Sequence, residues 1–168
     1  PIIALYETNR LRQISDGAEA ERTRNVPNGI RLERFVPLRS MRTEAIPPVL
    51  CLIGRVVPIK DIKTFIRSMR RIVNKLPQAQ AWIAGPTDED PSYVQECKNL
   101  VASLSLQNHV KFLGMQRIED LMPLVGLVVL SSVSEALPLV ILEAQASGVP
   151  VVSTDVGSCS QLINGLDE

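Results

Sequence analysis

The sequence is poor in the residues that metal sites and nucleophilic catalysis need. Its 168 residues include one histidine, His109, and three cysteines with no CxxC pair. An odd cysteine count without interleaved histidines excludes a disulfide framework and a zinc site, and it fits a reducing compartment. One histidine also leaves little room for a Ser/His or Cys/His pair. We therefore expect a cytoplasmic protein that has no metal site.

Net charge and long apolar runs are missing as well. The 18 Lys and Arg residues balance 18 Asp and Glu residues, so no overall basic field favours nucleic acid or anionic lipid. No apolar run reaches the ~18 residues of a membrane span, and the start lacks the layout of a signal peptide. The length corresponds to about one domain of ~150 residues. Fibrous, secreted and metal-finger classes are excluded.

What is present is an alternation of short apolar runs with amphipathic stretches. The runs have little polar alternation, which is typical of strands buried on both faces. We predict strands at residues 49–53, 81–84, 110–113, 127–130 and 151–152. We predict helices at residues 62–76, 91–104, 119–124 and 138–147. This alternation predicts an α/β fold with a Rossmann-like, doubly wound parallel sheet. Residues 1–48 are charge-rich and irregular.

A parallel sheet of this kind binds ligands beyond the carboxyl ends of its strands. The first such loop, residues 54–60, carries Arg55 and Lys60 just before a predicted helix, with only Asp61 close in sequence. An anion held between the two cations and the helix N-terminus would relieve their repulsion, and phosphate is the usual occupant. The alternative is that both are solvated surface charges. Because GxGxxG and Walker A motifs are absent, a dehydrogenase or P-loop NTPase is disfavoured.

The segment 131–148 holds two glutamates. Pro138 pushes the preceding residue toward extended geometry, so Glu135 is expected in the loop. Pro138 fits the first helical position, and the free amides after it would face the same crevice. Glu143 lies in a helix that is apolar nearly all round, where a carboxylate needs hydrogen-bond donors such as vicinal sugar hydroxyls. The alternative is that Glu143 occupies an exposed edge beside Gln145.

Together these motifs resemble the retaining GT4-type glycosyltransferases, which have two Rossmann-like domains in a GT-B fold. The segments that carry the resemblance are Val26-Pro27-Asn28-Gly29-Ile30, Arg34-Phe35 with Pro37, Gly54-Arg55, Lys60-Asp61, Phe112-Leu113-Gly114, Glu135, Glu143-Ala144 and Gly148–Val152. More narrowly, residues 52–65 and 154–159 resemble the PelF-type enzymes of bacterial Pel exopolysaccharide synthesis, a biofilm polymer. The resemblance runs from about Val26 to the end of the chain.

The resemblance implies a role for each site residue. Arg55 and Lys60 would bind the donor diphosphate, Glu143 would hold the ribose, and Glu135 would lie beside the donor sugar. Arg55, Lys60 and Glu135 are the residues implied for catalysis. The whole nucleotide-sugar site would consist of Gly54, Arg55, Lys60, Gly114, Met115, Gln116, Arg117, Glu135, Ala136, Leu137, Pro138, Leu139, Val140 and Glu143. Residues 114–117 would contact the nucleobase and the amides of 137–140 the phosphates.

The resemblance also implies a division of the chain and a reaction. Residues 1–25 would be a remnant of an acceptor domain, 26–48 a linker, and 49–168 the C-terminal, nucleotide-sugar-binding half of a GT-B fold, truncated at its end. The whole enzyme would transfer a hexose from a UDP-sugar, expected to be UDP-glucose, to a growing exopolysaccharide without a cofactor, in a membrane-bound synthesis complex. This chain alone would bind the donor without turnover.

Two alternatives remain open. The first is a non-catalytic nucleotide-binding module with a similar sheet. The second is a GT-B epimerase or phosphorylase, which the single histidine and the position of Lys60 in a phosphate loop disfavour, because a phosphorylase needs a pyridoxal lysine.

Overall fold

A computed structural model describes residues 1–42 and 45–165 and is built around a five-stranded parallel sheet. The strands are β3 (Val49–Ile53), β4 (Gln80–Ala84), β5 (Val110–Gly114), β6 (Leu127–Leu130) and β7 (Val151–Ser153). Their order across the sheet is β5-β4-β3-β6-β7, and every neighbouring pair is parallel. The predicted strands and the predicted doubly wound parallel sheet are therefore confirmed.

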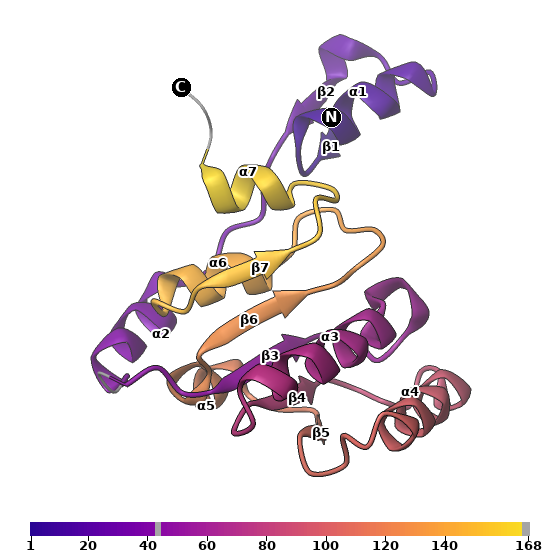
Figure 1. Ribbon diagram of the computed structural model, residues 1–168. Helices are drawn as coiled ribbons and strands as arrows, with labels where there is room; N and C mark the ends of the chain where they lie inside the picture. The colour runs from indigo at the N-terminus through magenta and orange to yellow at the C-terminus, as the bar shows by residue number, and fades with distance from the viewer. Residues whose placement is uncertain (43–44, 166–168) are drawn as a thin grey trace.

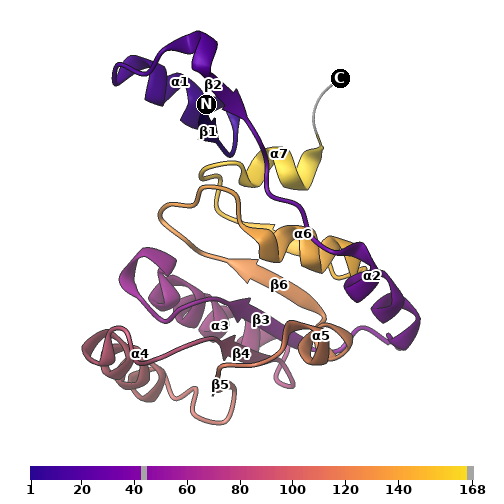
Figure 2. The ribbon, with the colours of Figure 1, turned by 180° about the vertical axis from the view of Figure 1, so that it is seen from behind.

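Helices cover both faces of this sheet (Figure 1). One face carries α3 (Ile62–Lys75) and α4 (Pro91–Ser103), whose apolar sides pack on β3, β4 and β5. The other face carries α2 (Leu32–Phe35), α5 (Ile118–Leu121) and α6 (Leu139–Ala146), as Figure 2 shows from behind. Next to α6 lies α7 (Cys159–Asn164), which the sequence analysis did not predict. Short 3-10 segments are η1 (Ala20–Arg22), η2 (Val36–Met41), η3 (Pro58–Lys60) and η4 (Met122–Leu124).

The starts of the helices follow from local chemistry. The carboxylate of Asp61 accepts the N–H of Thr64 at 3.3 Å, and that of Asp90 accepts the N–H of Tyr93 at 2.9 Å. Both aspartates are N-caps, which satisfy amides that have no partner within the helix. One boundary differs. Pro138 is the N-cap of α6 and not its first helical residue, because its ψ of 109° keeps it extended.

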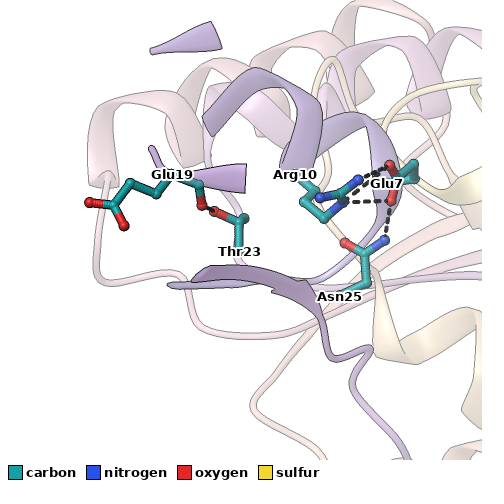
Figure 3. Close-up of polar contacts among 5 residues, drawn as sticks. All are labelled: Glu7, Arg10, Glu19, Thr23 and Asn25. Atoms are coloured by element: carbon teal, nitrogen blue, oxygen red, sulfur yellow. Dashed lines mark hydrogen bonds and ion pairs between the residues drawn. The ribbon is translucent and has the colours of Figure 1, made fainter. Parts of the chain in front are cut away.

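The first 25 residues are more regular than the sequence indicated. Strand β1 (Ile2–Ala4), helix α1 (Glu7–Ser15) and strand β2 (Thr23–Asn25) form a separate two-stranded parallel sheet with its own crossover helix. The Glu7 carboxylate joins α1 to β2, since it accepts from Arg10 Nε at 3.0 Å and from Asn25 Nδ2 at 2.5 Å (Figure 3). This unit stands apart from the main sheet, near α7 (Figures 1 and 2).

A cavity of about 440 Å³ separates the N-terminal unit from α6 and α7. Leu5, Glu7 and Asn25 line it on one side, and Leu137, Leu142 and Ser158 are among the residues on the other.

None of the helices within residues 1–42 and 45–165 is long and apolar enough to cross a membrane.

Candidate functional site

The chain switches from one half of the sheet to the other between β3 and β6, and parallel sheets of this kind bind ligands in a crevice at such a switch point. The loops after these two strands meet there. Val133 N–H donates to the Ile59 carbonyl at 2.9 Å. The Ser131 hydroxyl donates to the Lys60 and Asp61 carbonyls at 3.0 and 2.9 Å. The two loops that the sequence analysis singled out are thus bonded into one structure.

Lys60 and Glu135 face each other across this crevice. Lys60 Nζ lies 2.5 Å from Glu135 Oε1, and the Ser132 hydroxyl donates to the same oxygen at 2.6 Å. Only 21% of the lysine side chain and 10% of the glutamate side chain are exposed. The Lys60 stem passes over Gly54, its Cε lying 3.6 Å from where a β-carbon on Gly54 would be. The structure therefore brings two expected site residues into direct, largely desolvated contact.

Arg55 has a different partner. Its Nη1 lies 2.6 and 2.8 Å from the two carboxylate oxygens of Glu89, and both side chains are about half exposed. From the sequence we expected a bound anion to relieve the repulsion between Arg55 and Lys60. In the structure a carboxylate of the chain itself faces each cation.

The close approach of two backbones brings Glu89 within reach of Arg55. A β-carbon on Gly85, whose φ is +152°, would lie 2.0 Å from the Gly54 carbonyl oxygen. Gly54 N–H donates to the Ala84 carbonyl at 2.9 Å, and Val56 N–H donates to the Pro86 carbonyl at 3.0 Å. Glycine at 85 thus lets the loop after β4 lie against the loop after β3.

A third loop, residues 154–158, fixes the main chain around Glu135. Gly157 has a φ of +59°, and a β-carbon there would lie 2.1 Å from the Glu135 carbonyl oxygen. The Ser158 hydroxyl and N–H both donate to the Ala136 carbonyl, at 2.9 and 3.1 Å. Thr154 Oγ1 donates to the Ser132 carbonyl at 2.6 Å. Glu135 is therefore held from its backbone as well as from its side chain.

Helix α6 begins directly after this loop. Ile141 N–H is bonded to the Pro138 carbonyl at 3.2 Å, so the amides of Leu139 and Val140 precede the first bond of the helix. Such amides carry the positive end of the helix dipole and favour an anion. The start of α6 thus adds positive potential next to the Glu135 loop.

Glu143 lies one turn into α6 and is half-buried. No side-chain hydrogen bond reaches its carboxylate from the described residues. Burial raises the pKa of Glu143, nearby Arg34 opposes that rise, and Glu119 adds to it. Arg34 is itself paired with Glu119. The carboxylate has lost water without gaining a donor, which is the condition under which a hydroxylated ligand binds favourably.

Residues 114–117 comprise the last residue of β5 and the exposed loop that follows it. Gly114 has a φ of +66°, and its carbonyl accepts the Gly85 N–H at 2.8 Å. Met115 is 74% exposed, and Gln116 Nε2 donates to the Leu113 carbonyl at 2.8 Å. Arg117 faces Asp120 at 3.8 Å. Across residues 1–42 and 45–165, no hydrogen bond or ion pair joins 115–117 to Lys60 or Glu135.

Sequence reasoning missed three groups beside the expected residues. Ser132 could have been found, because a serine three residues before a loop glutamate is well placed to bond it. Glu89 was given no role from the sequence, because its contact with Arg55 depends on the strand order. The same holds for the Arg34–Glu119 pair next to Glu143. Within the described part of the chain, no group of three or more His, Cys, Asp and Glu could hold a metal ion.

Comparisons with known proteins agree on one family. Residues 47–168 match the family model described as glycosyl transferases group 1. A D-inositol 3-phosphate glycosyltransferase of Nocardia farcinica is 30% identical over an alignment of 159 positions, which covers 88% of this chain and 35% of the relative. The chain therefore spans about a third of the length of such curated relatives.

Solved structures show the same fold. Anabaena HepE in complex with UDP-glucose superposes with a TM-score of 0.83 at 28% identity, over 95% of this chain and 46% of that protein. Sucrose-phosphate synthase of Thermosynechococcus elongatus superposes with a TM-score of 0.74 at 29% identity, over 93% of this chain and 41% of that protein. The parallel sheet and its helices therefore match one domain of the GT-B glycosyltransferases.

Proposed function

The chain belongs to the group 1 glycosyltransferases, and on that basis we propose that it is the donor-binding part of a retaining, PelF-type enzyme. That enzyme would transfer a hexose from a UDP-sugar, UDP-glucose above all, to a growing exopolysaccharide. One observation carries the proposal. Lys60 and Glu135 form a largely desolvated ion pair at the switch point of the sheet, directly before the start of α6.

The chemistry of the crevice supports a nucleotide sugar. Lys60, Arg55 and the first amides of α6 are hydrogen-bond donors suited to a diphosphate. Glu143 is a half-buried carboxylate in need of donors, and a ribose diol supplies two. HepE, which is 28% identical to this chain, has been solved with UDP and with UDP-glucose. Residues 114–117 are proposed to contact the base.

In the proposed reaction the chain stabilises the leaving diphosphate. Negative charge grows on the phosphate as the bond to the sugar breaks, and preorganised donors at that point lower the barrier by about 3 kcal/mol each. Arg55 can turn from Glu89 to the phosphate at little expense, because exposed ion pairs contribute about 1 kcal/mol or less. The cations and amides would supply the counter-charge, so we propose that no metal is needed.

The proposal extends to the rest of the enzyme. Residues 49–168 would be the donor domain, 26–48 the linker and 1–25 the last part of an acceptor domain that binds the polysaccharide. The β1-α1-β2 unit, with its own sheet, is compatible with this division. The whole enzyme would work at the cytoplasmic side of a membrane-bound synthesis complex. The chain alone would bind the donor without turnover.

Titration calorimetry of UDP into the chain tests the proposal. We expect binding by the wild type and at least tenfold weaker binding by Lys60→Ala and by Glu143→Ala. Lys75→Ala, which removes an exposed lysine at the end of α3, is the matched control and should bind like the wild type. EDTA should leave the affinity unchanged. Equal affinity in all four proteins would remove the site assignment.

A further inference from the structure

The two oxygens of the Glu135 carboxylate have different surroundings. Oε1 accepts both Lys60 Nζ at 2.5 Å and Ser132 Oγ at 2.6 Å. Oε2 takes no hydrogen bond from the described residues, and it is not among the polar atoms that are shut off from solvent without a partner. One oxygen is therefore saturated by the protein, and the other is open to a further donor.

Ser132 is the more rigid of the two donors. Its residue is 3% exposed, and its carbonyl is fixed by Thr154 Oγ1 at 2.6 Å. The neighbouring Ser131 hydroxyl is bonded to the main chain of Lys60 and Asp61. The serine that holds Glu135 is thus anchored to the loops on both sides of it. Lys60, by contrast, reaches Glu135 with a flexible four-carbon stem.

The difference matters when a diphosphate binds. A phosphate carries more charge than a carboxylate and draws the Lys60 ammonium toward itself. The lysine contact to Oε1 then weakens, and the Ser132 hydroxyl is the contact that stays. Without it, the carboxylate could rotate and present either oxygen, or neither, to the crevice.

We propose that Ser132 is a positioning residue of the donor site: it keeps Oε1 of Glu135 occupied, so that Oε2 accepts a hydroxyl of the donor sugar. This inference rests on the proposed function and concerns its sugar part alone. UDP, which lacks the donor sugar, gains nothing from an oriented Glu135. The contribution of Ser132 is therefore visible only as the gain in affinity from UDP to the UDP-sugar.

The experiment measures that gain by calorimetry for UDP, UDP-glucose, UDP-galactose and UDP-N-acetylglucosamine. In Ser132→Ala we expect UDP to bind as in the wild type, while the favoured UDP-sugar loses about tenfold in affinity, as expected for a lost hydrogen bond to a charged group. Ser132→Thr, which keeps the hydroxyl, should restore the gain. Ser134→Ala is the matched control, since Ser134 lies exposed in the same loop.

The outcomes separate the two proposals. A wild type that does not bind UDP contradicts the proposed function. A wild type that binds UDP and all three UDP-sugars equally contradicts the role of Glu135 and so this inference. Ser132→Ala with an unchanged gain, or with equal losses for UDP and UDP-sugar, also overturns it. Should Ser132→Ala not fold by circular dichroism, Glu135→Gln tests the same contact, and an unchanged gain there is equally decisive.

Discussion

The backbone of Gly157 lies against the carbonyl oxygen of Glu135, so closely that a β-carbon at residue 157 would stand 2.1 Å from that oxygen. Real side chains do not tolerate such a distance. The oxygen belongs to the main chain and the β-carbon is fixed rigidly to it, so neither can move alone. The shape of the loop that carries Glu135 therefore depends on the absence of a side chain at Gly157, which lies 22 positions further along the chain.

Gly157→Ala is expected to destabilise the chain. The clash with the Glu135 carbonyl and the φ of +59° together should lower the free energy of unfolding by about 3 kcal/mol. Gly114→Ala is the control, because it has a similar φ of +66° but no atom within 4 Å of the new β-carbon. It should cost only about 1 kcal/mol, the strain of the left-handed backbone. Urea unfolding measures both, and equal values would refute the clash.

The ion pair between Lys60 and Glu135 should be energetically coupled, unlike the one between Arg55 and Glu89. A double-mutant cycle with Lys60→Met and Glu135→Gln is expected to give a coupling of about 2 kcal/mol, because the pair is largely desolvated. The same cycle with Arg55→Met and Glu89→Gln should give about 0.5 kcal/mol, since both groups are half exposed. Salt should weaken the second coupling far more than the first. Two equal couplings would contradict the burial argument.

Glu143 should make stability depend on pH in the direction opposite to most carboxylates. Burial raises its folded-state pKa above the ordinary 4.5. Between the unfolded-state pKa and the raised folded-state pKa, the folded state holds more protons than the unfolded state. The free energy of unfolding therefore falls as pH rises through that window. Glu143→Gln removes the effect. We therefore expect the free energy of unfolding of the variant to rise relative to that of the wild type as pH rises above 4.5. Urea unfolding at a series of pH values measures the difference.

Glu119 provides the contrasting case. Its folded-state pKa is lowered, first by its own backbone N–H and then by Arg34. Its contribution to stability is therefore present above the ordinary pKa and is lost as pH falls through the folded-state value. Glu119→Gln should lose stability relative to the wild type at neutral pH and match it in acid. If the stability of both variants relative to the wild type changed with pH in the same way, the different environments that the structure gives Glu143 and Glu119 would be contradicted.

The cysteines should be unreactive in the folded chain. Cys51, Cys97 and Cys159 have no exposed surface, and burial raises the pKa of Cys51 to about 12. Because the thiolate is the reactive form, we expect no rapid reaction with a disulfide reagent in native buffer. All three thiols should react at once in denaturant. A thiol that titrates within seconds in the native chain would contradict the burial of these residues.

Whether a structural feature could be predicted from the sequence depends on how far apart in the chain the interacting residues lie. Elements set by neighbouring residues were predicted: β3 from its apolar run, and α3 and α4 from their amphipathic stretches. Two short elements were not predicted: β2 has no apolar run, and α7 has too few residues to show a helical period. The exact start of α6 depended on the ψ of Pro138, which no local pattern determines.

The site divides in the same way. That the loops after β3 and β6 would meet followed from the parallel sheet, since both strands end at the same edge. The partners within those loops did not follow. Arg55 meets Glu89 only because Gly85 lets two backbones touch, and Lys60 meets Glu135 only because β6 is the neighbour of β3. Strand order is a property of the whole chain, so single motifs could not reveal these pairs.

The pairing of Lys60 with Glu135 joins residues 75 positions apart, and this has a consequence for biosynthesis. The ribosome delivers the lysine, β3, β4 and their helices well before it delivers the glutamate. During that interval the ammonium group of Lys60 lies in water without its carboxylate partner, Glu135. Completion of the site is thus tied to the arrival of β6, and a nascent chain halted before that strand would lack Glu135 and with it the binding site.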